Sequence, residues 1–154
     1  MADFDKKLRG KVVDVLNRIL EAELAGVVRY THYSFMVFGY TRIPIVSWLR
    51  SQATESMGHA QQAGEMVTNL GEHPSLGIGQ LLETHKHDIG QILQEALQNE
   101  REGLKLYKEL LELVEGKSVA LEEYARTMIH DEQMHVFEVD KMLRKPGDLG
   151  RHDD

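Results

Sequence analysis

Residues 72–81 read EHPSLGIGQL and form the longest break between the stretches of the sequence that show helical periodicity. Pro74, Gly77 and Gly79 all disfavour a helix in this segment. About ten residues in an extended conformation span roughly 33–36 Å, and a helix of about 27 residues is about 40 Å long. The segment is therefore long enough to run along most of a helix and to return the chain parallel to it.

The sequence on either side of this break predicts four long helices. Apolar residues recur at helical spacing in 7–38, 44–70 and 82–115. Ser118 is a favourable N-cap for a fourth helix, which is expected to reach residue 144 before Pro146 ends it. The connections around Gly39 and Gly116 are short, so each joins two antiparallel neighbours.

These lengths predict an all-α fold, an antiparallel four-helix bundle with a long crossover between the second and third helices. The bundle is assigned to residues 1–145, and residues 146–154 form a short polar C-terminal tail. An ordinary up-down-up-down bundle with a floppy second loop is the alternative.

The composition limits the chemistry. The 154 residues include no cysteine, so disulfides, iron–sulfur clusters and thiol nucleophiles are excluded, and a metal must be held by histidine and carboxylates. The net charge of −7 argues against nucleic acid as a partner and suits a protein that attracts cations. Because no membrane-spanning stretch and no secretory signal are visible, a cytoplasmic location is expected.

Carboxylates and histidines occur on the predicted helices where apolar residues would form a core. Glu132 and His135, in HDEQMH, lie three residues apart and therefore on one face of the fourth helix. Glu23 on the first helix and Glu100 on the third lie close to apolar positions of the helical pattern. Each is followed seven residues later by a tyrosine on the same face: Tyr30 and Tyr107.

The second helix offers a less regular pair. If TESMGHAQQ and HDEQMHVFE are read as an internal repeat, His59 aligns with His135, and Ser56 takes the place of Glu132. Glu55 lies one residue before Ser56, within about 40° of His59 on the helical wheel. A local widening of the helix, a π-bulge, is expected to bring Glu55 into line.

The sequence resembles the bacterioferritins, within the ferritin-like superfamily, over nearly its whole length. The resemblance rests on ILEAELAGVVRY, ESMGHAQQAGEM, DEQMH and LGEHPSL, together with Glu100. Ferritin-like di-iron sites take one Glu from each of two helices and a Glu-x-x-His pair from each of the other two. The resemblance implies a di-iron centre with ferroxidase activity, in which O2 or H2O2 oxidises Fe(II) to Fe(III) for iron storage or detoxification. The implied metal and catalytic residues are Glu23, Glu55, His59, Glu100, Glu132 and His135.

A haem site is a second implication of the resemblance. In bacterioferritins a methionine two residues before the second-helix histidine binds haem b between two subunits, and Met57 occupies that position. Two residues correspond to about 200° on a helix, so Met57 faces away from the metal side. Packing at a subunit interface is the alternative role.

The resemblance also implies a homo-oligomer. Bacterioferritins end in a short fifth helix that lines the four-fold axes of a 24-subunit shell, and the polar C-terminal tail is too broken for that helix. A 12-subunit shell with a dimer as its building unit, or only a dimer, is therefore expected in preference to a 24-subunit shell. The alternative function is a mini-ferritin-like, stress-protective shell that sequesters iron with weak or no catalysis. A rubrerythrin-like peroxidase is disfavoured, because that family usually carries an iron module bound by cysteines.

Overall fold

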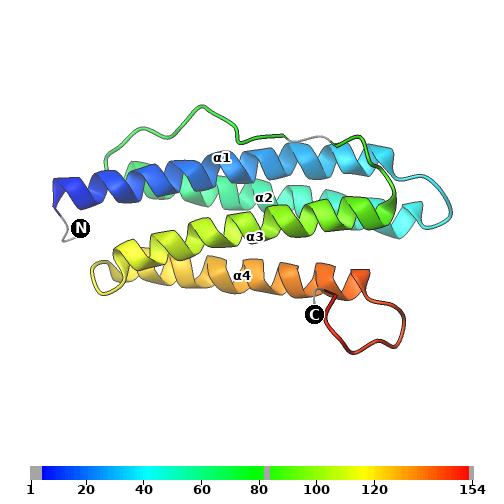
Figure 1. Cartoon of the computed structure of the whole chain (residues 1–154). Coiled ribbons are helices and arrows are strands. Elements are labelled where there is room, and N and C mark those ends of the chain that lie inside the picture. Colours follow the sequence, from blue (N-terminus) through cyan, green and yellow to red (C-terminus); the bar gives the residue numbers. More distant parts are fainter. Residues whose placement is uncertain (1–4, 82–83, 153–154) are drawn as a thin grey trace.

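The computed structural model describes residues 5–81 and 84–152 and contains no strand within them. Its four helices are α1 (Lys6–Met36), α2 (Arg42–Asn69), α3 (Ile89–Val114) and α4 (Val119–Leu143). α1 packs antiparallel against α2, and α3 antiparallel against α4, while the crossover returns the chain along α1 so that α2 and α3 run parallel (Figure 1). The all-α bundle with a long crossover between its second and third helices is confirmed.

Side-chain caps and glycines set the ends of the helices. Asp5 Oδ1 accepts a hydrogen bond from the Leu8 N–H at 2.8 Å, and Ser118 caps α4, as predicted. α2 ends at Asn69, and two residues later Gly71 has a φ of 78°, in the left-handed region that favours glycine. The N–H groups of Gly71 and Glu72 then bond back to the carbonyls of the last turn, which closes the helix in a Schellman motif.

The third helix begins later than predicted. The expected start at residue 82 lies outside the described residues, but residues 84–88 are not helical, and the Asp88 carboxylate caps the helix at Ile89. Before this cap the Thr84 hydroxyl donates to Glu95, and the crossover that precedes this segment docks on α1. The Gly79 N–H donates to the Glu21 carbonyl at 2.9 Å, and Arg29 donates to the Gln80 carbonyl at 3.0 Å.

The apolar core lies in parts on either side of a polar layer. A large cluster at the end where α3 turns into α4 includes Leu16, Val67, Leu110 and Met128, one from each helix. Smaller clusters fill the other end of the bundle, around Leu49 and Leu97. The functional side chains described below lie between them, so the apolar clusters hold the four helices in place around the site.

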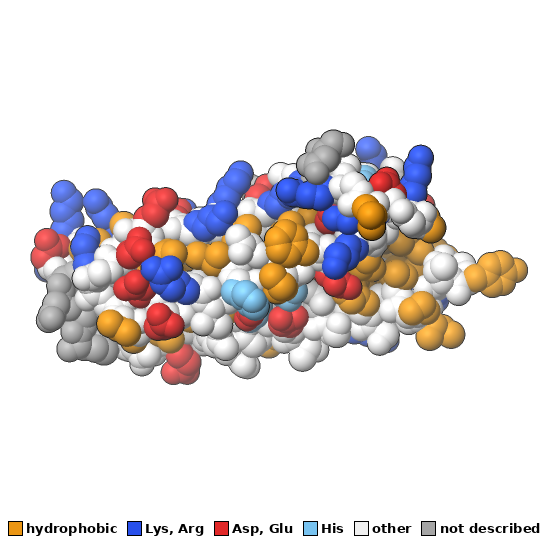
Figure 2. Space-filling model, turned by 90° about the horizontal axis from the view of Figure 1, so that it is seen from below, with side chains coloured by type: hydrophobic (Ala, Val, Ile, Leu, Met, Phe, Trp, Pro, Cys, Tyr) orange, Lys and Arg blue, Asp and Glu red, His pale blue; other side chains and the backbone are white. Residues whose placement is uncertain are grey.

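Apolar side chains are also exposed at one tip of the molecule. They gather where α1 turns into α2 and project from that end in the view from below (Figure 2). Phe38, Tyr40 and Ile43 are the most exposed of them. Within the two described ranges, no helix carries an apolar stretch long enough to cross a membrane.

Candidate metal centre

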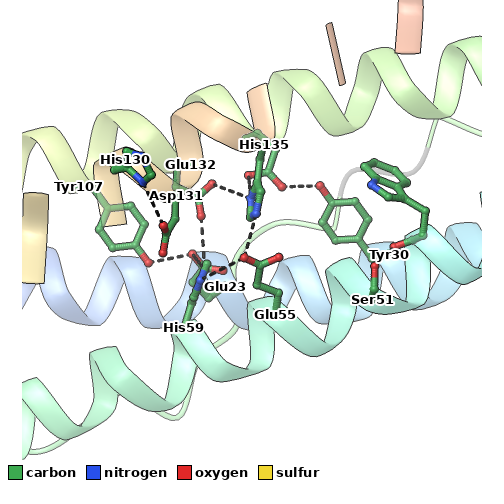
Figure 3. A network of polar contacts seen from close by, with 12 residues as sticks. Glu23, Tyr30, Ser51, Glu55, His59, Tyr107, His130, Asp131, Glu132 and His135 are labelled. Carbon is green, nitrogen blue, oxygen red and sulfur yellow. Dashed lines mark hydrogen bonds and ion pairs between the residues drawn. The ribbon is translucent and has the colours of Figure 1, made fainter. Parts of the chain in front are cut away.

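Five of the six predicted site residues form a buried polar layer at mid-length of the bundle (Figure 3). Each helix contributes at least one of them, and their side chains are between 5% and 17% exposed. The five are Glu23 on α1, His59 on α2, Glu100 on α3, and Glu132 and His135 on α4. The structure therefore brings together side chains that are far apart in the sequence.

The layer consists of two groups that share one carboxylate. In the first, His59 Nδ1 lies 3.4 Å from Glu23 Oε1 and 3.4 Å from Glu132 Oε1. In the second, His135 Nδ1 lies 3.6 Å from Glu100 Oε2 and 4.0 Å from Glu132 Oε2. The ligand atoms of each group lie within 4.8 Å of one another, so each group could hold a metal ion. Glu132 offers one oxygen to each group and so could bridge two ions.

Glu55, the sixth predicted residue, lies outside both groups. Its Oε1 is 2.9 Å from His135 Nε2 and 3.9 Å from His59 Nε2, so it contacts the ring nitrogens that face away from the shared carboxylate. Its side chain is 40% exposed. The predicted π-bulge is wrong, since α2 is a regular α-helix from Arg42 to Asn69. Glu55 reaches both histidines without it, because it lies one turn before His59 on the same face.

Two buried tyrosines fix the outer carboxylates in a crossed pattern. The Tyr30 hydroxyl on α1 donates to Glu100 on α3, and the Tyr107 hydroxyl on α3 donates to Glu23 on α1 at 2.8 Å. Trp48 packs edge-on against Tyr30, with ring centroids 6.2 Å apart. The sequence showed each tyrosine on the same helix face as a site glutamate, but not that each bonds the glutamate of the other helix.

The carboxylates of the layer share protons in the metal-free protein. Burial raises the pKa of Glu132 to about 11, and the neighbouring Glu100 and Glu23 act in the same direction. For Glu100 burial is outweighed by Glu132, His135 and Tyr30, which lower its pKa to about 2. A protonated Glu132 that donates a hydrogen bond to an ionised Glu100 accounts for the raised pKa of Glu132 and the lowered pKa of Glu100.

The pKa values of the two histidines are also raised. Burial lowers the pKa of His135, but the neighbouring carboxylates, Glu100 first among them, outweigh it and raise the pKa to about 9. The pKa of His59 is raised in the same way, with burial outweighed by Glu23. At neutral pH the layer therefore balances its carboxylates with protons, which a cation would have to displace.

The donor set fits a pair of transition-metal ions. Imidazole and carboxylate together suit iron, manganese or zinc. The His135 Nδ1 atom is buried and finds no hydrogen-bond partner among the described residues. Because it points at Glu100 and Glu132, a metal ion held by those carboxylates would satisfy it.

A cavity of about 320 Å³ leads to the layer from the face formed by α1, α3 and the crossover. Its lining includes the layer carboxylates Glu23, Glu100 and Glu132, together with Ser56 and Gly103. Gly103 is a sequence signal for this cavity, since glycine is unfavourable inside a helix and Gly103 lies within α3. The cavity therefore places open space directly beside three carboxylates of the layer.

Met57, the predicted haem ligand, and His130, the first residue of the HDEQMH motif, lie apart from the layer. Met57 is 39% exposed and lines a shallow hollow on the outer face of α1 and α2, together with Val27 and Ala53. His130 is exposed beside Asp131 and belongs to neither group. Met57 thus faces away from the metal side, as predicted.

Comparisons with known proteins agree with this geometry. The family model described as Ferritin-like domain matches residues 13–147. A ferritin-like, diiron-carboxylate protein from Bacillus anthracis str. Ames is 25% identical, with a TM-score of 0.85 over 92% of this chain and 100% of that chain. No curated protein matches the sequence.

Two further solved structures share the fold. The dodecameric thioferritin of Bacteroides fragilis, a bacterioferritin-related protein, is 20% identical, with a TM-score of 0.81 over 88% of this chain and 85% of that chain. The bacterioferritin of Rhodobacter capsulatus is 23% identical, with a TM-score of 0.77 over 87% of this chain and 84% of that chain. Since the family model covers most of the sequence and the helices follow the same arrangement, this chain belongs to the ferritin-like domain family.

Proposed function

We propose that this protein is a bacterioferritin-like ferroxidase that binds two Fe(II) ions between its helices and oxidises them with O2 or H2O2. The observation that carries the proposal is the pair of buried groups joined by Glu132. A shared carboxylate holds two cations close together, so one oxidant molecule can take an electron from each. The cavity lined by Glu23, Glu100 and Glu132 offers both iron and oxidant a way to the site.

The protein's own groups hold and release protons in this reaction. Fe(II) binding displaces the proton that Glu132 shares with Glu100 and the one on His135, so binding is expected to tighten as pH rises, and the raised pKa of His59 acts in the same direction. Tyr30 and Tyr107 keep Glu100 and Glu23 oriented while the ions exchange. The apolar clusters on either side of the layer shield it from bulk water.

Anaerobic titration of the apoprotein with Fe(II), followed by a pulse of O2, tests the proposal. Two Fe(II) per chain and rapid growth of Fe(III) absorbance are expected. Glu132→Gln should lose both sites, whereas Glu123→Gln, an exposed glutamate on the same helix, should behave as the wild type. Iron oxidation no faster than in buffer would contradict the proposal.

An iron-sequestering role without catalysis is the second candidate. It is favoured by one observation: Glu55 lies outside both groups, so the described structure gives the two ions only one shared protein carboxylate. The same titration separates the two functions. Two Fe(II) bound without fast oxidation would support sequestration and exclude the ferroxidase.

A shell of twelve subunits, built from dimers, is the assembly we propose. The Bacteroides fragilis protein is described as dodecameric. Residues 144–152 form no fifth helix and fold back on α4, where the His152 N–H donates to Asp140 and Arg144 donates to the Leu149 carbonyl. The exposed apolar tip at Phe38 and Tyr40 suits contact with other copies (Figure 2). Light scattering of the purified protein tests the subunit number.

Haem b at Met57 is a separate proposal. An exposed methionine in a shallow hollow suits a haem shared by two copies, but it equally suits packing between them. Titration with haem decides between the two roles. Binding at one haem per two chains that is lost in Met57→Leu supports ligation, and a Met57→Leu variant that changes only the dimerisation constant supports packing.

A further inference from the structure

The two histidines of the layer each have a metal-facing side and an outer side. Their Nδ1 atoms face the carboxylates of the two groups, at distances of 3.4 to 4.0 Å. Their Nε2 atoms face the other way, and both approach the same oxygen, Glu55 Oε1. The rings of His59 and His135 stack at an interplanar angle of 19°, so one carboxylate can serve both (Figure 3).

In a Glu-x-x-His pair that ends at His59, the glutamate would stand at position 56, where this chain has Ser56. Its side chain is buried and turned toward α1, where a Cβ built on Gly26 would lie 3.1 Å from the Ser56 Oγ. The side chain also lines the cavity on the α1 and α3 face. An uncharged hydroxyl therefore stands where a second bridging carboxylate would reach the ions.

Glu55 lies on the opposite side of the histidines from this cavity. It is the most exposed acidic group of the site, at 40%, whereas the Glu132 side chain is 5% exposed. Histidines that bind a metal through one nitrogen commonly donate the other N–H to a carboxylate, which fixes the orientation of the ring. The 2.9 Å contact between Glu55 Oε1 and His135 Nε2 has that geometry.

We propose that Glu55 is a positioning residue rather than a metal ligand. It accepts from His135 Nε2, and from His59 Nε2 after a small movement, and so holds both Nδ1 atoms toward the ions. The two ions then share a single protein carboxylate, Glu132, and the space beside Ser56 is left to small molecules from the cavity. This assignment rests on the proposed function, because it requires that two ions bind.

Co(II) binding to the full-length apoprotein tests the assignment without iron turnover. Glu55→Ala should still bind two Co(II) per chain, with affinity lowered about 10- to 100-fold, as is typical for the loss of a carboxylate behind a histidine ligand. Glu55→Gln keeps an oxygen that can accept from Nε2, so its affinity should return to within about threefold of the wild type, since an exposed charge contributes little. The Co(II) absorption bands should be alike in all three proteins, because the ligand set is unchanged.

Matched variants and outcomes separate this assignment from the proposed function. Glu65→Ala and Glu65→Gln, at an exposed glutamate on the same helix, correct for the loss of one surface charge. If Glu55→Gln binds as weakly as Glu55→Ala, or either variant loses one ion or changes the Co(II) bands, then Glu55 is a ligand. If Glu55→Ala binds like the wild type, Glu55 has no positioning role. A wild-type protein that binds fewer than two Co(II) would overturn the proposed function and this assignment with it.

Discussion

The large apolar cluster and the polar layer are built from the same four helices and are buried to a similar degree, but their energetics differ. In the cluster, side chains such as Leu16, Leu110 and Met128 gain free energy simply by leaving water. In the layer, Glu132 and Glu100 lose hydration and must be compensated by protons, hydrogen bonds or cations. The difference indicates that the cluster stabilises the fold, whereas the layer costs free energy unless protons, hydrogen bonds or cations compensate it.

The largest expected effect is on the free energy of unfolding, and it is tested by substituting one residue in the cluster and one in the layer. Leu110→Ala opens a void in the cluster and should lower the free energy of unfolding of the apoprotein by ~2–5 kcal/mol. Glu132→Met replaces a carboxyl that is protonated in the apoprotein with a side chain of similar volume, so its unfolding free energy should stay within about 1.5 kcal/mol of the wild type.

Metal binding should show the reverse. Leu110→Ala keeps two ions per chain, whereas Glu132→Met loses both, since Glu132 belongs to both groups. Denaturant unfolding with a chelator present and Co(II) titration of the same samples provide the two measurements. If Glu132→Met is destabilised as much as Leu110→Ala, the layer stabilises the fold in the same way as the cluster, and the proposed difference is wrong.

The second expected effect is a pH dependence of the folding stability that comes from the layer and not from the apolar cluster. The folded pKa of His135 is raised from 6.5 to about 9, so the folded state binds more protons than the unfolded state in this range. Its contribution is fully present below pH 6.5 and lost as pH rises toward 9, which amounts to at most ~3 kcal/mol. The raised pKa of Glu132 acts in the same direction over this range.

Thermal unfolding at pH 6.5 and pH 9 measures this loss. With a chelator present, the melting temperature should fall by at least about 5–10 °C over this range, which is the part that His135 alone contributes. With excess Zn(II), whose binding tightens as protons leave, the fall should be absent or reversed. An equal melting temperature at both pH values in the apoprotein would show that the layer does not hold these protons.

Local signals in the sequence were sufficient for most of the fold. The Ser118 cap, Gly71 and Gly116 act within one turn of the chain, so their effects are visible without tertiary structure. The start of α3 was predicted too early, at residue 82, although Asp88 offers a local cap of the same kind. The contacts that hold the crossover before it on Glu21 and Arg29 are not visible in the sequence.

The sequence predicted which side chains meet in the site, but not how these side chains are oriented. Helical spacing brought Glu132 and His135 to one face, and four such faces converge in the bundle. Whether Glu55 reaches a metal-facing nitrogen or the opposite one depends on a single residue of offset, about 100° on the helix, and on side-chain torsions. The crossed bonds of Tyr30 and Tyr107 depend likewise on the packing of α1 against α3.

A smaller effect tests the hydrogen bonds at the border between the layer and the cluster. The ring of Tyr107 packs in the large apolar cluster, and its hydroxyl donates to Glu23 in the polar layer. Tyr107→Phe keeps the ring and removes the donor, so it should lower the free energy of unfolding by ~1–3 kcal/mol. Tyr40→Phe, at an exposed tyrosine, should change it by less than about 0.5 kcal/mol. Equal stability of the two variants would show that Glu23 does not need its hydroxyl partner.

The smallest expected effect concerns Gly103, where stability and access to the layer are in conflict. An added Cβ at Gly103 would meet no atom of the described residues within 4 Å, so Gly103→Ala should stabilise α3 by ~0.5–1 kcal/mol. Gly64→Ala on α2 has the same freedom and should give a similar gain, although Gly64 does not line the cavity.

Gly103→Leu, by contrast, places a large side chain in the cavity beside the carboxylates. If the cavity is the route to the layer, Gly103→Leu should slow Co(II) uptake in stopped-flow measurements while the number of ions bound stays at two, and Gly64→Leu should not. Equal uptake rates in the two leucine variants would mean that ions reach the layer from the side of Glu55, where the histidines meet the solvent.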